Sequence, residues 1–207
     1  MPAKVKICGL TDPAALEAAA DADWIGFNFF PPSPRFVTPV QAAAISATHP
    51  GGPARVGLFI DPADDDVEAA LDAVELDVLQ IYADPARAAA LRERFARPVW
   101  HAVGIATSSD LPTDNAVDGY LLDAKPPEGT PLPGGNALRF DWSILRAWTA
   151  TKPWLLAGGL SPSNVAEAIA VSGALAVDVS SGVERRRGVK DPALIRAFIA
   201  AARASAP

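Results

Sequence analysis

Eight short apolar runs, each followed by a polar turn and in most cases a helical stretch, recur along this chain of 207 residues. The runs span residues 5–8, 24–29, 55–60, 78–82, 99–105, 119–122, 154–157 and 175–179. Apolar strands that alternate with helices pair in parallel and have both faces covered, as in an open doubly wound sheet or a closed barrel. Eight units favour closure. We therefore expect an α/β fold, a single (β/α)8 TIM barrel domain over residues 1–207.

Helix starts are marked by six dipeptides in which proline follows a capping residue. They are Asp12-Pro13, Thr38-Pro39, Asp61-Pro62, Asp84-Pro85, Ser161-Pro162 and Asp191-Pro192. The polar side chain accepts hydrogen bonds from free amides, and proline supplies a helical φ. Because such barrels typically need about 250 residues, this one must be compact. The fifth connection, TSSDLPTDNAV, lacks helical periodicity, which predicts a weak or missing fifth helix, and the sixth has a long loop, PPEGTPLPGG, before a helix around FDWSILRAW.

Composition excludes several classes of protein. A net charge of -6 and a pI near 4.9 argue against a partner that is nucleic acid, since such binders carry a clustered cationic face. The apolar runs are far shorter than the roughly 20 residues that cross a bilayer, so no membrane partner is expected. One cysteine and no signal-peptide pattern predict a cytoplasmic protein. Nothing in the sequence indicates an oligomeric state.

Reactive residues of a (β/α)8 barrel stand where strands end and the following loops begin. That rule selects Cys8, Arg35, Asp61, Tyr82, Asp123, Gly158, Gly159, Asp178, Ser180, Ser181 and Gly182. The glycines and serines of the last two loops predict a phosphate cradle, because exposed amides and hydroxyls there can bind a dianion. The alternative for each loop is a tight turn or a helix cap. Asp61, before Pro62, is assigned to capping.

Cys8 is either a small buried hydrophobe or a general base. Lys6 lies two residues earlier on the same strand face, where its ammonium could favour the thiolate or pair with Asp178 inside the barrel. Asp123 is either a cap or a general acid. Arg35, between prolines and aromatics, is a surface residue, half of a salt bridge, or a fork for a ligand carboxylate. The two histidines lack metal-like spacing, and no dinucleotide fingerprint follows a strand, so neither a metal nor another cofactor is expected.

The chain resembles the phosphoribosylanthranilate isomerase family of tryptophan biosynthesis over nearly its whole length. The resemblance rests on KICGLT, GFNFFPPSPRFV, VGLFID, LLDA, FDWSIL, LAGGLSPSNVAEAI and VDVSSGVERRRGVKDP, in the family's order and spacing. It implies a (β/α)8 barrel that converts N-(5-phosphoribosyl)anthranilate to 1-(2-carboxyphenylamino)-1-deoxyribulose 5-phosphate by an Amadori rearrangement. The implied partner is therefore a small phosphorylated substrate, and no cofactor is needed.

The resemblance also implies roles for matching residues. Cys8 would be the general base, Asp123 the general acid, and Arg35 the ligand of the anthranilate carboxylate. Asp178 would contact the sugar. The implied phosphate-binding residues are Gly158, Gly159, Ser180, Ser181 and Gly182.

Two segments depart from the family pattern. QIYADPA stands where the family reads QLHGDE, which places Tyr82 at a substrate-binding histidine position and Ala83 at a glycine. GGNA replaces GGTG before the FDW run. Two other readings of the whole chain are another sugar-phosphate aldose-ketose isomerase barrel and a barrel that binds a phosphometabolite without catalysis. The aminoaldose isomerase of histidine synthesis normally uses paired aspartates, whereas the first strand here ends in a cysteine. This difference favours the anthranilate substrate over the substrate of that enzyme.

Overall fold

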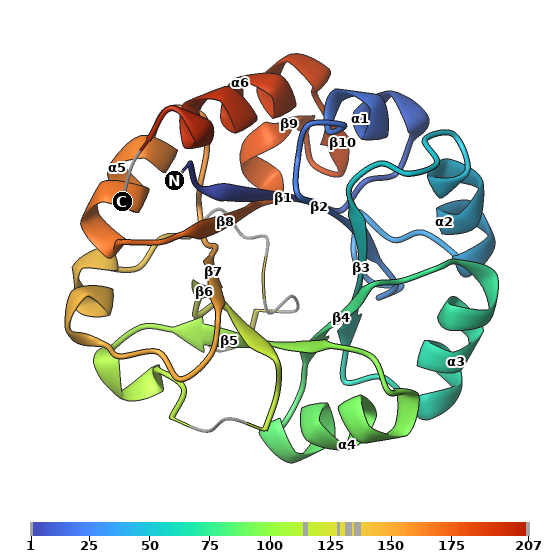
Figure 1. Ribbon diagram of the computed structural model, residues 1–207, viewed down its shortest axis with the longest axis horizontal. Coiled ribbons are helices and arrows are strands. Elements are labelled where there is room, and N and C mark those ends of the chain that lie inside the picture. The colour runs from blue at the N-terminus through green and yellow to red at the C-terminus, as the bar shows by residue number, and fades with distance from the viewer. Residues whose placement is uncertain (1, 114–115, 128, 131–133, 135–137, 206–207) are drawn as a thin grey trace.

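Eight parallel strands close into a barrel in chain order, as Figure 1 shows. The structure is a computed structural model that describes residues 2–113, 116–127, 129–130, 134 and 138–205. The strands are β1 Lys4–Cys8, β2 Trp24–Asn28, β3 Ala54–Ile60, β4 Val78–Tyr82, β5 Val99–Ile105, β6 Gly119–Ala124, β7 Trp154–Leu156 and β8 Ala176–Val179. β1 pairs with both β2 and β8, which closes the barrel. The predicted (β/α)8 fold is confirmed.

Helices form a ring outside the strands (Figure 1). The α-helices are α1 Pro13–Ala18, α2 Pro39–Ser46, α3 Asp64–Ala73, α4 Pro85–Phe95, α5 Val165–Ser172 and α6 Pro192–Arg203. In its described residues, the connection after β5 holds only a 3-10 turn, η1 Ser108–Asp110, so the weak fifth unit is confirmed. The helix expected around FDWSILRAW forms as a 3-10 helix, η2 Trp142–Ala147. Part of the long loop before it, including 135–137 of the GGNA segment, lies outside the described residues.

Four of the six predicted caps are confirmed by hydrogen bonds, at the starts of α1, α2, α4 and α6. Two are wrong. Asp61 lies in the left-handed region at φ 41°, and α3 begins beyond it, where Asp66 accepts a hydrogen bond from the Ala63 amide. The Ser161 amide donates a hydrogen bond to Asn164 Oδ1, and α5 starts after Asn164. In both cases the proline follows a turn, so the helix starts later than the dipeptide indicates.

The barrel interior changes from apolar to polar toward the carboxyl ends of the strands. One small cluster of Trp24, Val56, Val78, Trp100, Leu155 and Ala176 fills the end near the strand starts, and a second, of Tyr82, Ala102, Leu121 and Ala157, lies above it. The main core lies outside, between strands and helices. Lys6, Gln80 and Asp178 are buried polar residues of the strands. This gradient leaves the polar chemistry at one mouth of the barrel.

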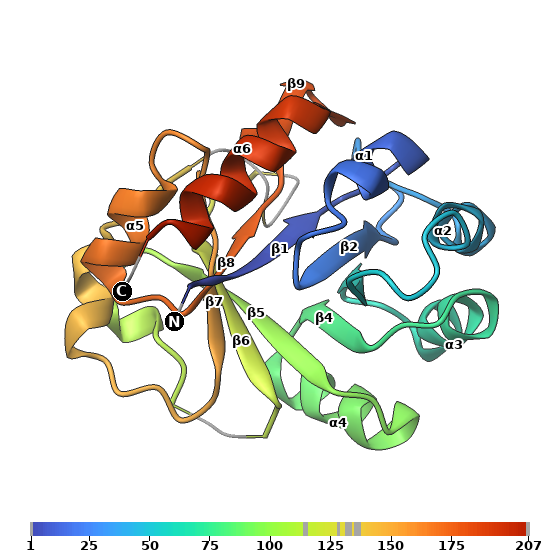
Figure 2. The same cartoon turned by 45° about the horizontal axis from the view of Figure 1, so that its top comes forward.

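An antiparallel hairpin follows β8, after the 3-10 turn η3 Ser181–Val183. Its strands are β9 Glu184–Arg186 and β10 Val189–Lys190. In Figure 2 β9 lies beyond the arrowhead of β1, beside α6. In the described part of the chain, none of the helices has the length and apolar character needed to span a membrane.

Candidate active site

The carboxyl ends of the strands surround one cavity, and almost all the predicted site residues line it. These are Cys8, Arg35, Tyr82, Asp123, Gly158, Gly159, Asp178, Ser180 and Ser181. Gly182 lies instead against the loop after β7, where an added Cβ would overlap the carbonyl oxygen of Leu160. Asp61 is an exposed turn residue and is not part of the lining. The barrel therefore brings together residues that are up to about 170 positions apart in the sequence, as the strand-end rule predicts.

Cys8 ends β1 with its side chain in the barrel interior, beside a buried ion pair. Lys6 Nζ lies 2.6 Å from Asp178 Oδ1 on β8. The close approach is possible because β2 contributes Gly26: a Cβ there would lie 3.0 Å from Cys8 Sγ and 3.4 Å from Lys6 Nζ. The predicted ion pair is thus present, and the ammonium also lies beside the thiol.

The electrostatics of this group favour a charged Lys6 and a largely protonated Cys8. Burial by itself lowers the pKa of Lys6, but the Asp178 carboxylate outweighs it, so that pKa is raised. Burial raises the pKa of the Cys8 thiol, the nearby Asp178 charge adds to this, and Lys6 and Lys190 offset part of the rise. The thiol therefore depends on its cationic neighbours to form the anion.

Asp123 lies on β6, and both of its carboxylate oxygens are held. Oδ1 accepts a hydrogen bond from the Ala124 amide at 2.8 Å, and Oδ2 accepts one from the Tyr82 hydroxyl at 3.3 Å. Burial and the Asp123 charge raise the pKa of Tyr82 well above its ordinary value, so Tyr82 is a neutral donor. Tyr82 was predicted to bind substrate; the structure shows it in contact with the candidate acid.

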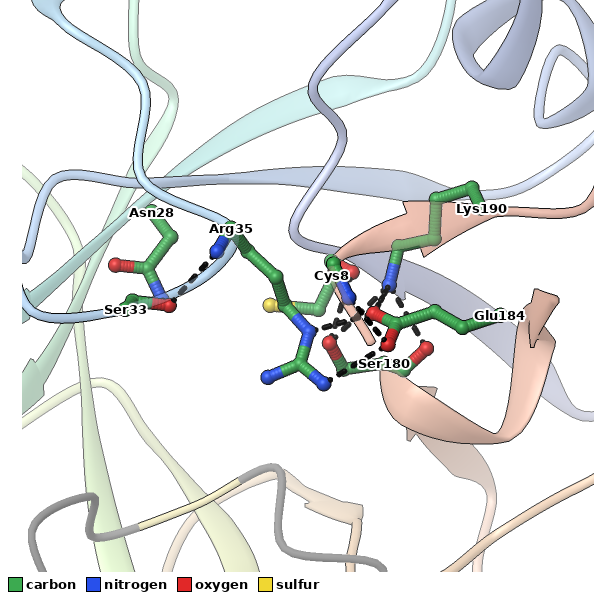
Figure 3. A network of polar contacts seen from close by, with 8 residues as sticks. Cys8, Asn28, Ser33, Arg35, Ser180, Glu184 and Lys190 are labelled. Atoms are coloured by element: carbon green, nitrogen blue, oxygen red, sulfur yellow. Dashed lines mark hydrogen bonds and ion pairs between the residues drawn. The ribbon is translucent and has the colours of Figure 1, made fainter. Parts of the chain in front are cut away.

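Arg35 is buried in the loop after β2 and is not a surface residue. Its guanidinium forms a bidentate pair with Glu184 at the start of β9, with Nε 2.6 Å from Oε1 and Nη2 3.1 Å from Oε2. Its backbone amide donates to Ser33 Oγ, which also receives a hydrogen bond from Asn28 (Figure 3). The salt-bridge alternative is thus present, while Arg35 still lines the cavity.

The two loops predicted as a phosphate cradle lie side by side at the cavity rim, because they follow the neighbouring strands β7 and β8. Gly158 and Gly159 both have positive φ, 88° and 62°, and a Cβ on Gly158 would lie 2.8 Å from the Ala124 amide nitrogen. Asn164 anchors this loop by donating to the Gly159 carbonyl. Ser180 donates to the Cys8 carbonyl oxygen at 3.1 Å. The loops can therefore present amides and hydroxyls to an anion at fixed positions.

Three site residues were missed by the sequence analysis. Glu184 and Lys190 of the hairpin hold Arg35 and Ser180. Gln80 lines the cavity, and its buried Oε1 has no hydrogen-bond partner among the described residues. The signal for Gln80 was its position two residues before Tyr82, on the same face of β4. Within the described residues, no group of three or more His, Cys, Asp or Glu side chains could hold a metal ion.

Comparison with known proteins identifies the family of this chain. Residues 5–201 match the family model described as N-(5'phosphoribosyl)anthranilate (PRA) isomerase. N-(5'-phosphoribosyl)anthranilate isomerase from Acidiphilium cryptum is 52% identical over 98% of this chain and 100% of its own, and the one from Granulibacter bethesdensis is 53% identical over 98% and 99%.

Solved structures give the same result. TrpF from Jonesia denitrificans has a TM-score of 0.80 and 38% identity, covering 97% of both chains. A phosphoribosyl anthranilate isomerase in complex with reduced 1-(o-carboxyphenylamino)-1-deoxyribulose 5-phosphate has a TM-score of 0.75 and 31% identity, covering 97% of this chain and 98% of its own. Fold and sequence agree, and the chain belongs to the N-(5'-phosphoribosyl)anthranilate isomerase family.

Proposed function

We propose that Cys8 and Asp123 carry out the acid/base steps of this chain's reaction. The chain is a phosphoribosylanthranilate isomerase of tryptophan biosynthesis. The observation that carries the assignment is that a thiol on β1 and a carboxylate on β6 line the same cavity from strands that are not neighbours in the barrel. A substrate between them can be protonated from one side and deprotonated from another.

The steps conserve atoms and electrons without an external oxidant. In its protonated form Asp123 donates a proton to the ribose ring oxygen as the C1–O bond breaks, and the anilino nitrogen lone pair forms the C1=N bond of an iminium ion. The Cys8 thiolate then removes the C2 proton, the electron pair of the C2–H bond forms the C1=C2 bond of an enolamine, and the C1=N π pair returns to the nitrogen. In the tautomerisation to the ketose, the C2 hydroxyl loses its proton as C2=O forms, and the C1=C2 pair takes up a proton at C1. Each proton transfer needs a group within hydrogen-bond reach and typically contributes about 100-fold or more to the rate.

The other residues bind the two charged ends of the substrate. The free edge of the Arg35 guanidinium suits the anthranilate carboxylate, and we assign the sugar contact to Asp178, which lines the same cavity. Gly158, Gly159, Ser180 and Ser181 offer backbone amides to the phosphate, Ser181 also offers its hydroxyl, and Gly182 shapes that loop. Binding energy at the two ends orients the reacting carbons between base and acid. We also infer a cytoplasmic location, from the biosynthetic role of the family.

The test is a fluorescence assay that follows loss of phosphoribosylanthranilate. We expect Cys8→Ser and Asp123→Asn each to lower kcat by at least about 100-fold, because serine is a far poorer base and the amide cannot deliver the proton. Both should keep the affinity for the reduced product analogue, because their shapes are nearly unchanged. Asp118→Asn, an aspartate before β6 that lies outside the cavity lining, is the matched control. Wild-type kcat in either site variant would show that its residue is not the catalyst.

A further inference from the structure

Glu184 is a buried carboxylate to which neither the sequence nor the reaction assigned a role. It accepts hydrogen bonds from Arg35 Nε at 2.6 Å and Nη2 at 3.1 Å, from Lys190 Nζ at 3.0 Å and from the Gly188 amide at 2.9 Å (Figure 3). Its side chain is 4% exposed, and those of Arg35 and Lys190 are 5% and 0% exposed. Both of its oxygens are therefore fully engaged.

The cluster holds two cations and one anion. Burial by itself raises the pKa of Glu184, but the hydrogen bond from Arg35 and the charges of Lys190 and Arg35 outweigh it, so that pKa is lowered. A buried ion is tolerated where it is paired and hydrogen-bonded, and Glu184 meets this condition for both cations. Burial lowers the pKa of Lys190, and the Glu184 charge opposes this effect. With both cations protonated, the cluster carries one net positive charge beside the cavity.

The bidentate contact decides where the rest of the guanidinium points. Glu184 occupies the edge formed by Nε and Nη2, and no described residue accepts a hydrogen bond from Nη1. Figure 3 shows Nη1 on the side away from Glu184. Because the guanidinium is planar, two hydrogen bonds to one carboxylate fix its plane and hence the direction of the free edge.

The stem of Arg35 is confined as well. Gly9 follows Cys8 with φ 76°, and a Cβ there would lie 2.7 Å from Arg35 Cδ. Gly188 in the hairpin turn has φ 80°, and its Cβ would lie 2.5 Å from the Pro34 carbonyl oxygen. The backbone thus approaches the Arg35 loop closely on two sides, and Glu184 fixes the remaining freedom at the tip.

Lys190 extends the same cluster to the other loop of the site. Its ammonium donates to the Ser180 carbonyl at 2.8 Å and to Ser180 Oγ at 3.2 Å, and Ser180 Oγ in turn donates to the Cys8 carbonyl. The Glu184 carboxylate is thereby connected to the end of β1 as well as to Arg35. The hydrogen bonds of Lys190 thus join Glu184 to the loop after β8.

We propose that Glu184 is a positioning residue that aims the free Nη1 edge of Arg35 at the ring carboxylate of the substrate, so that the hairpin from β9 to β10 sets carboxylate recognition. The inference rests on the proposed role of Arg35. Glu184 itself does not touch the substrate. Its effect should therefore appear in how the enzyme distinguishes ligands with and without that carboxylate.

The experiment measures the dissociation constants of two ligands by calorimetry. One is reduced 1-(o-carboxyphenylamino)-1-deoxyribulose 5-phosphate, and the other is the same molecule without the carboxylate. The dissociation constant of the ligand without the carboxylate, divided by that of the ligand with it, gives the preference for the carboxylate. This ratio is independent of the fraction of folded protein. Glu184→Asp keeps the charge but withdraws the carboxylate by about 1.5 Å, one carbon–carbon bond. We expect it to reduce the ratio at least about tenfold, because a displacement of about 1 Å in a positioned group has large effects.

Arg35→Ala separates this inference from the function on which it rests. If Arg35→Ala abolishes the preference for the carboxylate and Glu184→Asp weakens it only while Arg35 is present, the inference is supported. If Arg35→Ala abolishes the preference and Glu184→Asp leaves it at the wild-type value, Glu184 is only structural and the inference is overturned. If Arg35→Ala leaves the preference unchanged, Arg35 does not bind the carboxylate, and both statements are overturned.

Two further variants keep the test decisive. Asp118→Asn disrupts a bidentate pair with Arg92, at 2.7 and 2.9 Å, outside the cavity lining, and should leave the ratio unchanged. Should Glu184→Asp not fold, the double substitution of Glu184→Gln with Lys190→Met removes one charge of each sign and retains the net charge of the cluster. It is expected to show the same reduced ratio, and a wild-type ratio would overturn the inference.

Discussion

Replacing Lys6 with methionine tests whether the buried ammonium sets the reactivity of the Cys8 thiol. Lys6 Nζ and Cys8 Sγ both lie within 3.4 Å of the position that a Cβ of Gly26 would occupy, and the ammonium pairs with Asp178 at 2.6 Å. Methionine has a similar length and no charge. The substitution therefore removes a positive charge from the thiol while filling much of the same space.

The size of the effect follows from Coulomb's law. Two unit charges about 5 Å apart interact by about 3 kcal/mol at an effective dielectric constant of about 20, which corresponds to about 2 pKa units. The substitution removes this interaction while the Asp178 charge stays in place, so we expect the pKa of Cys8 to rise by up to about 2 units. Without Lys6, the remaining Asp178 charge acts in the same direction, because it also raises the pKa of Cys8.

The assay is the pH dependence of kcat/KM. A general base must be deprotonated, so kcat/KM rises with pH on the acid limb, and a higher thiol pKa moves that limb to higher pH. We expect Lys6→Met to lower kcat/KM at neutral pH by about 10- to 100-fold and to recover part of the loss at alkaline pH. Lys6→Arg should retain the wild-type limb.

Two controls separate tuning from folding. Lys4→Met removes a lysine from the same strand and face, at its exposed end over Trp24, and should leave the profile unchanged. Removing one partner of a buried pair typically costs about 3–5 kcal/mol of stability, so the Lys6→Met and Asp178→Asn double variant is measured as well. A folded Lys6→Met protein with the wild-type acid limb would refute the reasoning and leave the ion pair a purely structural role.

Two other predictions follow from single contacts. Tyr82→Phe removes the hydroxyl that donates to Asp123 Oδ2 at 3.3 Å. Because hydrogen bonds to charged groups contribute about 1.5–3 kcal/mol, kcat should fall by about an order of magnitude with little change in analogue binding. An unchanged kcat would mean that the hydroxyl does not support the acid. The hydrogen bonds from the amides of Thr107 and Ala106 lower the pKa of Asp110 to about 2, so its stabilising effect is present above its ordinary pKa and is lost as pH falls through about 2. Asp110→Asn should lower the urea midpoint at neutral pH, and a difference that persists unchanged at the acid end would contradict this.

Patterns local in the sequence predicted most of the fold. Apolar runs and proline caps located all eight strands and four of six helix starts, because strand burial and capping depend on neighbouring residues. The strand-end rule then identified Cys8, Tyr82 and Asp123. The failures at Asp61 and Ser161 have one cause: a proline at a helix start and a proline in a preceding turn look alike.

The supporting contacts could not be predicted in this way. Arg35 and Glu184 are 149 positions apart, and no local pattern connects them. Glu184 begins the segment ERRRGVK, which is typical of a solvated charged turn and forms strands of only three and two residues. Its burial depends on the hairpin docking onto the loop after β2. Contacts of this kind become visible only when tertiary structure places distant segments together.

The seam between the first and last strands has a consequence for folding. The ion pair between Lys6 and Asp178 joins residues 172 positions apart, so the electrostatic surroundings of the thiol are complete only when β1 has met β8. Contacts between distant chain segments carry a large loop-closure entropy and tend to form late. During synthesis or refolding, catalytic competence should therefore appear after most secondary structure has formed. The rate at which isomerase activity returns would then report the rate at which the barrel closes.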